Sequence, residues 1–258
     1  MSEQHASRVR RSEHHLEIGA SALHWDGSVL EVRLDERCMP LPRALRGRVL
    51  VRPRALTGHV VSLAPGHGWS PIAPSAAVSV ELDEPALRWT GSGYLDSNWG
   101  SAPLERDFRR WNWCRAPLDD GATAILYDTV LRDGRRADLA LRVGAQGTVA
   151  PFDPGGRAAL PATLWRLARE TRSARPERAE VLRTLTDSPF YSRSLLRTDL
   201  LGSRALAMHE SLDLDRFTRP WTQAMLPFRV RPALPGRAGR SPAAPDRPGA
   251  GRAPAAGP

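Results

Sequence analysis

The sequence predicts a mainly β fold, with antiparallel sheets arranged as a barrel or a sandwich. Apolar and polar residues alternate along residues 28–35 and again along residues 78–82, as in strands that bury one face of an antiparallel sheet. Asp-Gly pairs, which favour tight turns, lie at residues 26–27, 120–121 and 133–134. Residues 122–132, between the last two pairs, are rich in β-forming side chains, and residues 139–143 alternate again. This succession of strand, turn and strand is typical of an antiparallel meander.

Residues 160–186 fit either a helix or strands. Leu160, Leu164 and Leu167 would share one face of a helix, whereas Trp165, Leu167 and Arg169 alternate as in a strand. Pro176 argues against one long helix, because proline removes a backbone hydrogen bond from a helix interior. We favour strands here, because the preceding segments are predicted strands.

The composition is that of an ordinary soluble protein. The 258 residues are 41% hydrophobic and 25% charged, with a formal net charge of +9. No apolar run approaches the ~20 residues that a transmembrane helix requires, and the polar N-terminus lacks the apolar core of a secretory signal. The two cysteines, Cys38 and Cys114, form neither a disulfide framework nor a metal-binding spacing. We therefore expect a cytoplasmic location.

A large part of the net charge lies at the C-terminus. Every basic residue of the chain is Arg, and residues 231–258 hold five of them, one Asp and many Pro, Gly and Ala residues. Such a segment has little apolar surface to bury, so we expect a disordered tail. The other residues carry a net charge of +5 without the basic clusters and interleaved aromatic residues of a nucleic-acid-binding surface. We therefore expect no nucleic-acid partner.

Two short segments place polar and aromatic residues two positions apart. His67 and Trp69 form one pair, and Tyr94 and Asp96 form the other. Residues two apart in an extended chain project from the same face, so the members of each pair are expected to point the same way. Inside a barrel, an apolar environment would disfavour the charged form of Asp96, which suits a carboxyl group that donates a proton.

Structural roles for the same residues remain open on spacing alone. A His in a loop rich in Pro and Gly is commonly a surface residue, and Asp96 begins an Asp-Ser-Asn sequence that is typical of a turn. Four tryptophans within 25 residues would either fill a core or line a cavity for an apolar ligand; they are Trp89, Trp99, Trp111 and Trp113. Nucleotide-binding, serine-hydrolase and metalloprotease motifs are missing from the sequence.

Longer motifs resemble those of a known family. The sequences HGWSPIAP (residues 67–74) and GYLDSNWGSAPLERDFRRWNWCRA (residues 93–116) are similar to the carotenoid 1,2-hydratases, also called hydroxyneurosporene synthases. Later segments, such as TLTDSPFYSRSLL and HESLDLDRF, resemble the C-terminal half of that family. The resemblance extends from about residue 15 to residue 231. It implies paired lipocalin-like β-domains.

The resemblance also implies how the chain is divided. We expect a disordered N-terminus over residues 1–14, the remainder of a first lipocalin-like domain over 15–105, a second such domain over 106–230 and a disordered tail over 231–258. Members of the family begin with a further N-terminal segment, so the first domain is expected to be incomplete and to have unpaired strand edges. The chain would then be a truncated form, or its start codon would be placed too late.

The activity implied by the resemblance is that of a hydro-lyase. Water adds, without a cofactor, to the terminal C1=C2 bond of an acyclic carotenoid of the neurosporene or lycopene type, giving a tertiary alcohol at C1. Asp96 is the implied acid, Trp69 and Tyr94 would offer π-faces to the carbocation, and His67 would orient Asp96 or the incoming water. Such an apolar substrate implies peripheral contact with the inner, photosynthetic membrane. Alternatives are a non-catalytic isoprenoid-binding protein and an inactive truncated hydratase, and the oligomeric state is undetermined by the sequence.

Overall fold

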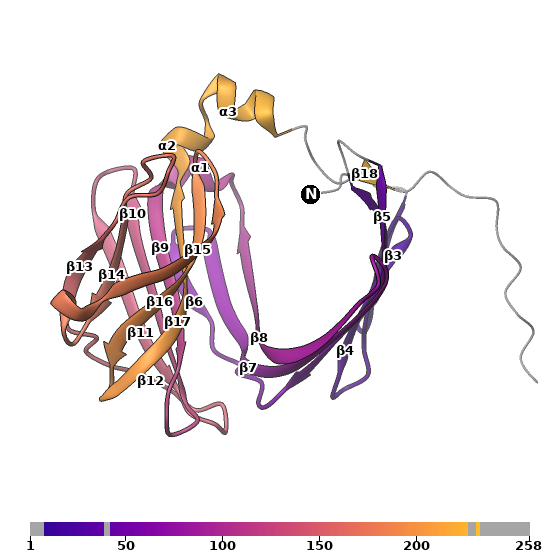
Figure 1. Cartoon of the computed structure of the whole chain (residues 1–258), viewed down its shortest axis with the longest axis horizontal. Helices are drawn as coiled ribbons and strands as arrows, with labels where there is room; N and C mark the ends of the chain where they lie inside the picture. The colour runs from indigo at the N-terminus through magenta and orange to yellow at the C-terminus, as the bar shows by residue number, and fades with distance from the viewer. Residues whose placement is uncertain (1–7, 39–41, 227–230, 233–258) are drawn as a thin grey trace, which may run out of the picture.

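Two large antiparallel sheets make up most of the molecule (Figure 1). The computed structural model describes residues 8–38, 42–226 and 231–232. Within these residues the first sheet has nine strands, the second has seven, and β13 and β14 form a separate two-stranded hairpin. The second sheet ends at strands β12 and β15, which do not pair with each other in the described part of the chain, so this sheet is open. The mainly antiparallel β fold predicted from the sequence is confirmed.

The first sheet comes mainly from the N-terminal part of the chain. Its strand order is β1-β2-β3-β4-β5-β7-β6, with β8 paired to β7 and β18 paired to β4. Asp26 closes the turn between β3 and β4, because its carboxylate accepts hydrogen bonds from the backbone N–H groups of Ser28 and Val29. The strands are β1 (Val9–Arg11), β2 (His15–Ile18), β3 (Ser21–Trp25), β4 (Leu30–Cys38), β5 (Arg43–Pro53), β6 (Val61–Ala64), β7 (His67–Glu84), β8 (Leu87–Gly100) and β18 (Arg231–Pro232).

The second sheet consists of two meanders joined side by side. Its order is β12-β11-β10-β9-β17-β16-β15, so β9 pairs with the late strand β17. The elements are α1 (Leu104–Asp107), β9 (Phe108–Pro117), β10 (Thr123–Leu131), β11 (Arg136–Val143), β12 (Val149–Pro151), β13 (Gly156–Leu160), β14 (Arg169–Ser173), η2 (Pro176–Arg178), β15 (Glu180–Asp187), β16 (Tyr191–Leu200), β17 (Ser203–Asp213), α2 (Leu214–Phe217) and α3 (Pro220–Met225). In Figure 1 the helices α1, α2 and α3 lie together at one end of this sheet.

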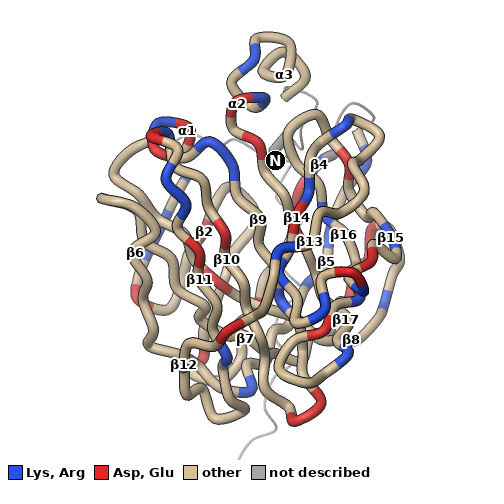
Figure 2. Tube along the Cα trace, turned by 90° about the vertical axis from the view of Figure 1, so that its left-hand side faces the viewer, with Lys and Arg blue, Asp and Glu red and all other residues tan. Residues whose placement is uncertain are grey.

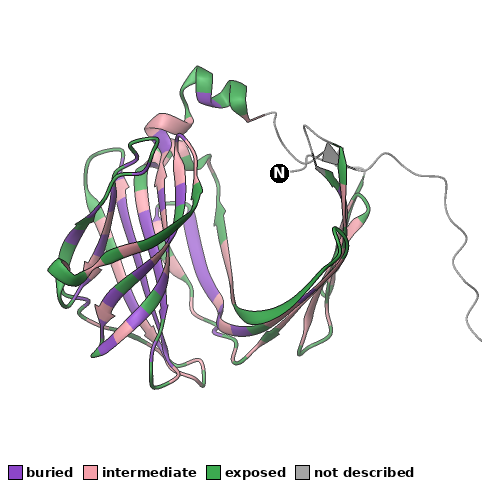
Figure 3. Ribbon diagram, in the orientation of Figure 1, coloured by how far each residue is buried: buried purple, intermediate pink, exposed green. Residues whose placement is uncertain are grey.

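Strand β10 of the second sheet is buried on both faces (Figure 3). Along β10, Ala124 and Leu126 belong to a core cluster shared with β13, β16 and β17. The intervening residues, Ile125 and Tyr127, belong to a second cluster that contains Trp69 of the first sheet. Because side chains alternate along a strand, a strand packed on both faces is apolar nearly throughout. This explains the rich β-forming content of residues 122–132.

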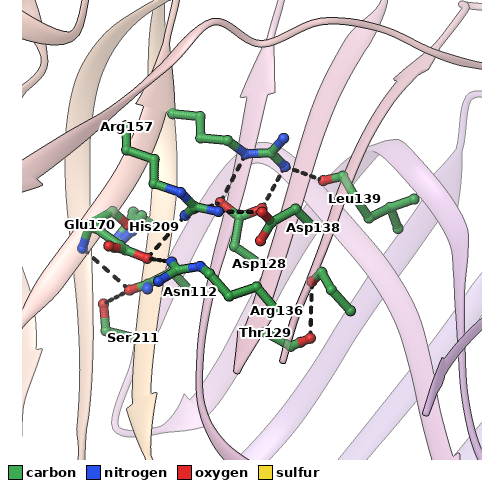
Figure 4. Close-up of polar contacts among 12 residues, drawn as sticks. Asn112, Asp128, Thr129, Arg136, Asp138, Leu139, Arg157, Glu170, His209 and Ser211 are labelled. Carbon is green, nitrogen blue, oxygen red and sulfur yellow. Dashed lines mark hydrogen bonds and ion pairs between the residues drawn. The ribbon is translucent and has the colours of Figure 1, made fainter. Parts of the chain in front are cut away.

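Charged side chains secure the β13–β14 hairpin over one face of the second sheet (Figure 4). Arg172 of β14 donates hydrogen bonds to both carboxylate oxygens of the buried Asp128 on β10. Arg157 of β13 forms ion pairs with Asp138 and Glu170. Burial raises the pKa of Asp128, and the adjacent Arg172 guanidinium opposes that shift. Paired charges therefore lie on the same face of β10 as the apolar cluster of Ala124 and Leu126.

Opposite charges also lie next to one another elsewhere on the molecule (Figure 2). In the first sheet, Arg46 forms ion pairs with Asp35 and Glu84, and Arg48 pairs with Glu81. These pairs are partly exposed, so solvent and salt screen them and each contributes little to stability.

Several strand predictions are confirmed. Residues 28–35 fall largely in β4, and residues 78–82 lie in β7. The predicted meander corresponds to β10 and β11, which β9 and β12 extend on either side. Over residues 160–186, the preference for strands is confirmed for β14 and for most of β15. It is wrong for residues 161–168, which form a turn closed by the backbone hydrogen bond from Thr163 N–H to the Leu167 carbonyl.

The prediction of disorder at both ends needs correction. Residues 9–11 form strand β1, paired with β2, although residues 1–14 were expected to lack structure. Residues 231 and 232 form β18 and pair with β4. Backbone N–H and C=O groups make these bonds, so a polar or Pro-containing sequence can still join a sheet edge. Residues 1–7 and 233–258 lie outside the described residues, and the domain boundary between residues 105 and 106 stays a prediction.

Candidate functional site

The candidate site lies where the long β7–β8 hairpin packs against the second sheet. His67 is opposite Gly100 in this hairpin, and Trp69 is opposite Asn98. Tyr94, Asp96 and Asn98 alternate along β8 and therefore share a face. The hairpin thus brings the two predicted pairs onto neighbouring strands.

Asp96 is held by two hydrogen-bond donors. Nε1–H of Trp69 donates to Oδ2 of Asp96 over 2.8 Å, and the hydroxyl of Tyr94 donates to the same oxygen over 3.1 Å. No hydrogen bond to the other oxygen, Oδ1, occurs within the described residues. Because Oδ2 already accepts two hydrogen bonds, a proton carried by this carboxyl group belongs on Oδ1.

Aromatic side chains from the second sheet pack against the two residues that hold this carboxyl group. Trp69 is fully buried, and its ring meets that of Tyr127 on β10 edge-on with centroids 5.2 Å apart. The Tyr94 ring lies 4.9 Å from the ring of Trp113 on β9. The hydroxyl of Tyr127 donates to Oδ1 of Asn98 over 3.3 Å. Both sheets therefore contribute to one aromatic cluster beside Asp96.

Both tyrosines of this cluster stay protonated. Burial raises the pKa of Tyr94 far above its ordinary value, and the nearby Asp96 carboxyl group raises it further. Burial is also the main cause of the raised pKa of Tyr127. A phenol that keeps its proton remains a hydrogen-bond donor, so Tyr94 can hold Asp96 across the physiological pH range.

Arg115 places a positive charge against the cluster. Its guanidinium carbon lies 5.9 Å from the centre of the Tyr94 ring, and its Nε donates to the carbonyl of Pro74 over 2.8 Å. Arg115 is buried, and no carboxylate lies within ion-pair distance of it in the described chain. A cation therefore already interacts with the π-face of Tyr94.

His67 is held by the carboxylate of Asp107. Its Nε2 lies 2.7 Å from Oδ2 of Asp107, the last residue of α1, and its ring contacts that of Phe108 at 5.1 Å. No hydrogen bond joins His67 to Asp96 in the described residues, so of the two predicted roles, orienting Asp96 or the incoming water, the first has no direct contact here. The buried Nδ1 of His67 has no partner there either. A side chain at Gly100 would collide with this imidazole, so glycine permits the close approach.

The structure thus joins Trp69, Tyr94 and Asp96 directly and places His67 at the adjoining position of the hairpin. Of the four clustered tryptophans, Trp111 and Trp113 belong to the aromatic cluster, whereas Trp89 and Trp99 are about half-exposed. Sequence reasoning missed four neighbours of the site: Asn98, Asp107, Arg115 and Tyr127. Only Asn98 had a local signal, because it follows Tyr94 and Asp96 at the same spacing of two residues.

Neither a metal-binding cluster nor a membrane-crossing helix occurs in the described residues. They contain no group of three or more His, Cys, Asp or Glu side chains that could hold a metal ion. They also contain no helix of the length and apolarity that a membrane crossing requires.

The fold and the site together define a lipocalin-like β protein with a hydrogen-bonded carboxyl group in an aromatic cluster. The fold is similar to the crystal structure of an AttH-type protein from Nitrosomonas europaea, with a TM-score of 0.53 and 14% sequence identity over 81% of this chain and 72% of that one. At this identity the likeness concerns the fold alone. The chain belongs to the carotenoid hydratase CrtC family, whose sequence model matches residues 1–241.

The relatives that the chain matches are longer than the chain itself. It is 46% identical over 233 residues to the acyclic carotenoid 1,2-hydratase of Thiocapsa roseopersicina, a match that covers 89% of this chain and 57% of that protein. It is 40% identical over 243 residues to the acyclic carotenoid 1,2-hydratase of Rhodobacter capsulatus, covering 93% of this chain and 84% of that protein. The chain therefore spans little more than half the length of the Thiocapsa relative. The family predicted from the sequence motifs is confirmed.

Proposed function

We propose that this chain adds water to the terminal C1=C2 bond of an acyclic carotenoid and that Asp96 is the proton donor. One observation carries the proposal: Trp69 and Tyr94 both donate to Oδ2 of Asp96. This leaves Oδ1 as the atom that bears and delivers a proton. The names of the relatives, which are acyclic carotenoid 1,2-hydratases, support the choice of substrate.

The reaction balances with water as its only co-reactant. The π electrons of the alkene form a bond from C2 to the proton of Asp96 Oδ1, and C1 becomes a tertiary carbocation. The oxygen of a water molecule then forms the C1–O bond, and its surplus proton passes to the Asp96 carboxylate. The product is a tertiary alcohol, and Asp96 is protonated again for the next cycle.

The surrounding residues have distinct tasks in this scheme. The rings of Trp69 and Tyr127 stabilise the carbocation with their π electrons. Tyr94 serves as a hydrogen-bond donor to Asp96, because Arg115 already lies over its ring. His67, held at Nε2 by Asp107, directs the incoming water with its unpartnered Nδ1.

Pigment analysis tests the proposal. The wild-type chain, Asp96→Asn and the control Asp83→Asn are expressed in cells that accumulate lycopene or neurosporene. Asp83 is an exposed residue on β7, so its variant controls for the loss of an aspartate. We expect a product heavier by one water molecule from the wild type and the control, and none from Asp96→Asn.

Two results would contradict the proposal. An Asp96→Asn variant with full activity would exclude Asp96 as the acid. A soluble wild-type chain that binds the carotenoid without converting it would favour the isoprenoid-binding alternative.

A further inference from the structure

Large apolar side chains are exposed at the helical end of the second sheet. Leu164 is 96% exposed, and Trp165 and Trp221 are 44% and 43% exposed. The two tryptophan rings stack with centroids 6.1 Å apart, which joins the turn after β13 to helix α3. Met225, at the end of α3, is also exposed. We call these four residues the apolar patch.

Hydrogen bonds fix the backbone beneath the apolar patch. Arg216 of α2 donates hydrogen bonds to the carbonyls of Trp165 and Arg166 over 2.7 and 3.0 Å. The N–H of Leu164 donates to Asp187, and Leu167 is buried. On the other side, buried Thr222 fixes α3 while the rest of that helix is largely exposed (Figure 3). The outward direction of these apolar side chains is therefore built into the fold.

One residue in this turn has an unfavourable backbone conformation. Arg166 has a φ of +57°, which a residue with a side chain rarely adopts. Local strain of this kind persists where surrounding contacts impose it, and it is often found at functional positions. Here it turns the chain so that Leu164 and Trp165 face outward while Leu167 remains buried.

The charge around the apolar patch is positive. Residues 161–168 and 216–226 contain Arg166, Arg216 and Arg219 but no Asp or Glu. Two acids lie just before, at positions 213 and 215. Asp213 is ion-paired with Arg216, and Asp215 is paired with Arg109 of β9 and with Arg132, which follows β10. A third acid, Asp187, accepts the hydrogen bond from Leu164 N–H, so two arginines without an ion pair in the described chain, Arg166 and Arg219, stand against one acid without one. An apolar surface with this positive excess matches the headgroup region of an anionic bilayer, where tryptophan side chains also prefer to lie.

Aromatic rings lead from this end of the molecule to the candidate site. Successive ring centroids from Trp69 to Tyr127, Trp111 and Phe108 lie 5.2, 6.0 and 5.9 Å apart. Phe108 packs in a core cluster with Leu214 of α2, the helix that precedes α3. An entry point at this end would therefore lie next to apolar side chains that continue to Asp96.

We infer that the apolar patch, together with Arg166 and Arg219, docks the chain onto the surface of an anionic lipid bilayer. The inference also rests on the proposed function, because an acyclic carotenoid is insoluble in water and must be taken from lipid. Insertion of Leu164 and the tryptophan pair anchors the protein, and the arginines contact the phosphate groups.

Flotation with vesicles tests the inference without any carotenoid, so its outcome is independent of hydratase activity. The vesicles contain phosphatidylcholine alone or a mixture with phosphatidylglycerol. We expect the wild type to bind the anionic vesicles, and Leu164→Ser combined with Trp221→Ala to lower the partition coefficient at least tenfold. Leu206→Ser is the matched control, because Leu206 is a 54%-exposed leucine on β17, and it should bind like the wild type.

A variant that removes one positive charge separates the electrostatic contribution to membrane binding from the apolar one. Arg219→Gln should weaken binding to anionic vesicles several-fold and lose its effect at high salt, because salt screens the attraction. Wild-type protein that does not bind anionic vesicles would overturn the inference, as would equal binding by the apolar-patch variant. A wild-type dimer that the Leu164→Ser, Trp221→Ala variant dissociates would also overturn it, because a second copy would then cover this surface.

Discussion

The buried imidazole of His209 should make the second sheet sensitive to acid. His209 lies on β17 opposite Cys114 of β9 and is completely buried. Burial lowers its pKa from 6.5 to about 4, and the positive charge of Arg169 contributes to the decrease. The lowered pKa means that the unfolded chain binds a proton more tightly than the folded one. Stability from this residue is therefore complete above pH 6.5 and is lost as the pH falls towards 4.

The size of the effect follows from the pKa difference. Each unit of pH below 6.5 costs about 1.4 kcal/mol until the folded-state value is approached, so about 2 kcal/mol is lost between pH 7.5 and pH 5. His209→Gln removes the titration, and its side-chain amide can still donate to the carbonyl of Glu170, which His209 Nε2 contacts over 2.9 Å.

Urea unfolding of the wild type and of His209→Gln, each at pH 7.5 and pH 5, measures the contribution of His209 to the free energy of unfolding. The difference between the two free energies of unfolding should shrink by about 2 kcal/mol on acidification, because the titrations of all other residues cancel. Free energies that fall in parallel would refute the reasoning, because they would mean that His209 titrates normally in the folded protein.

Two further predictions concern the candidate site. Trp69→Phe and Tyr94→Phe each remove one donor from Asp96, and such a bond contributes about 1.5–3 kcal/mol, or roughly 10- to 150-fold in rate. We expect the larger loss of activity for Trp69→Phe, because the hydrogen bond from Trp69 to Asp96 is 2.8 Å long and that from Tyr94 is 3.1 Å long. The amount of product formed per amount of soluble protein, compared between the two variants, checks this order. Asp107→Asn should lower turnover about tenfold without weakening carotenoid binding, because His67 loses its orienting carboxylate. Glu105→Gln on the same helix is the control, and full turnover in Asp107→Asn would disprove the role.

Local sequence patterns predicted the strands but only part of the site. The alternation along β4 and the Asp-Gly turn before it each involve residues that are adjacent in the sequence, so the sequence predicts them. The spacing of Tyr94 and Asp96 likewise placed both side chains on one face, as their hydrogen bond confirms. Edge strands such as β1 escaped prediction, because backbone groups rather than side chains make their bonds.

The pairings that make the site depend on contacts between distant parts of the chain. Trp69 meets Asp96 across 27 positions, and His67 meets Asp107 across 40. Tyr127 reaches the cluster only because β10 packs against the first sheet. By itself the sequence determined the strand class, the two candidate pairs and the family resemblance, since these depend on local order. The tertiary structure alone decided that Trp69 donates to Asp96, that Asp107 holds His67 and which tryptophans are buried, because strand pairing and sheet packing set those neighbours.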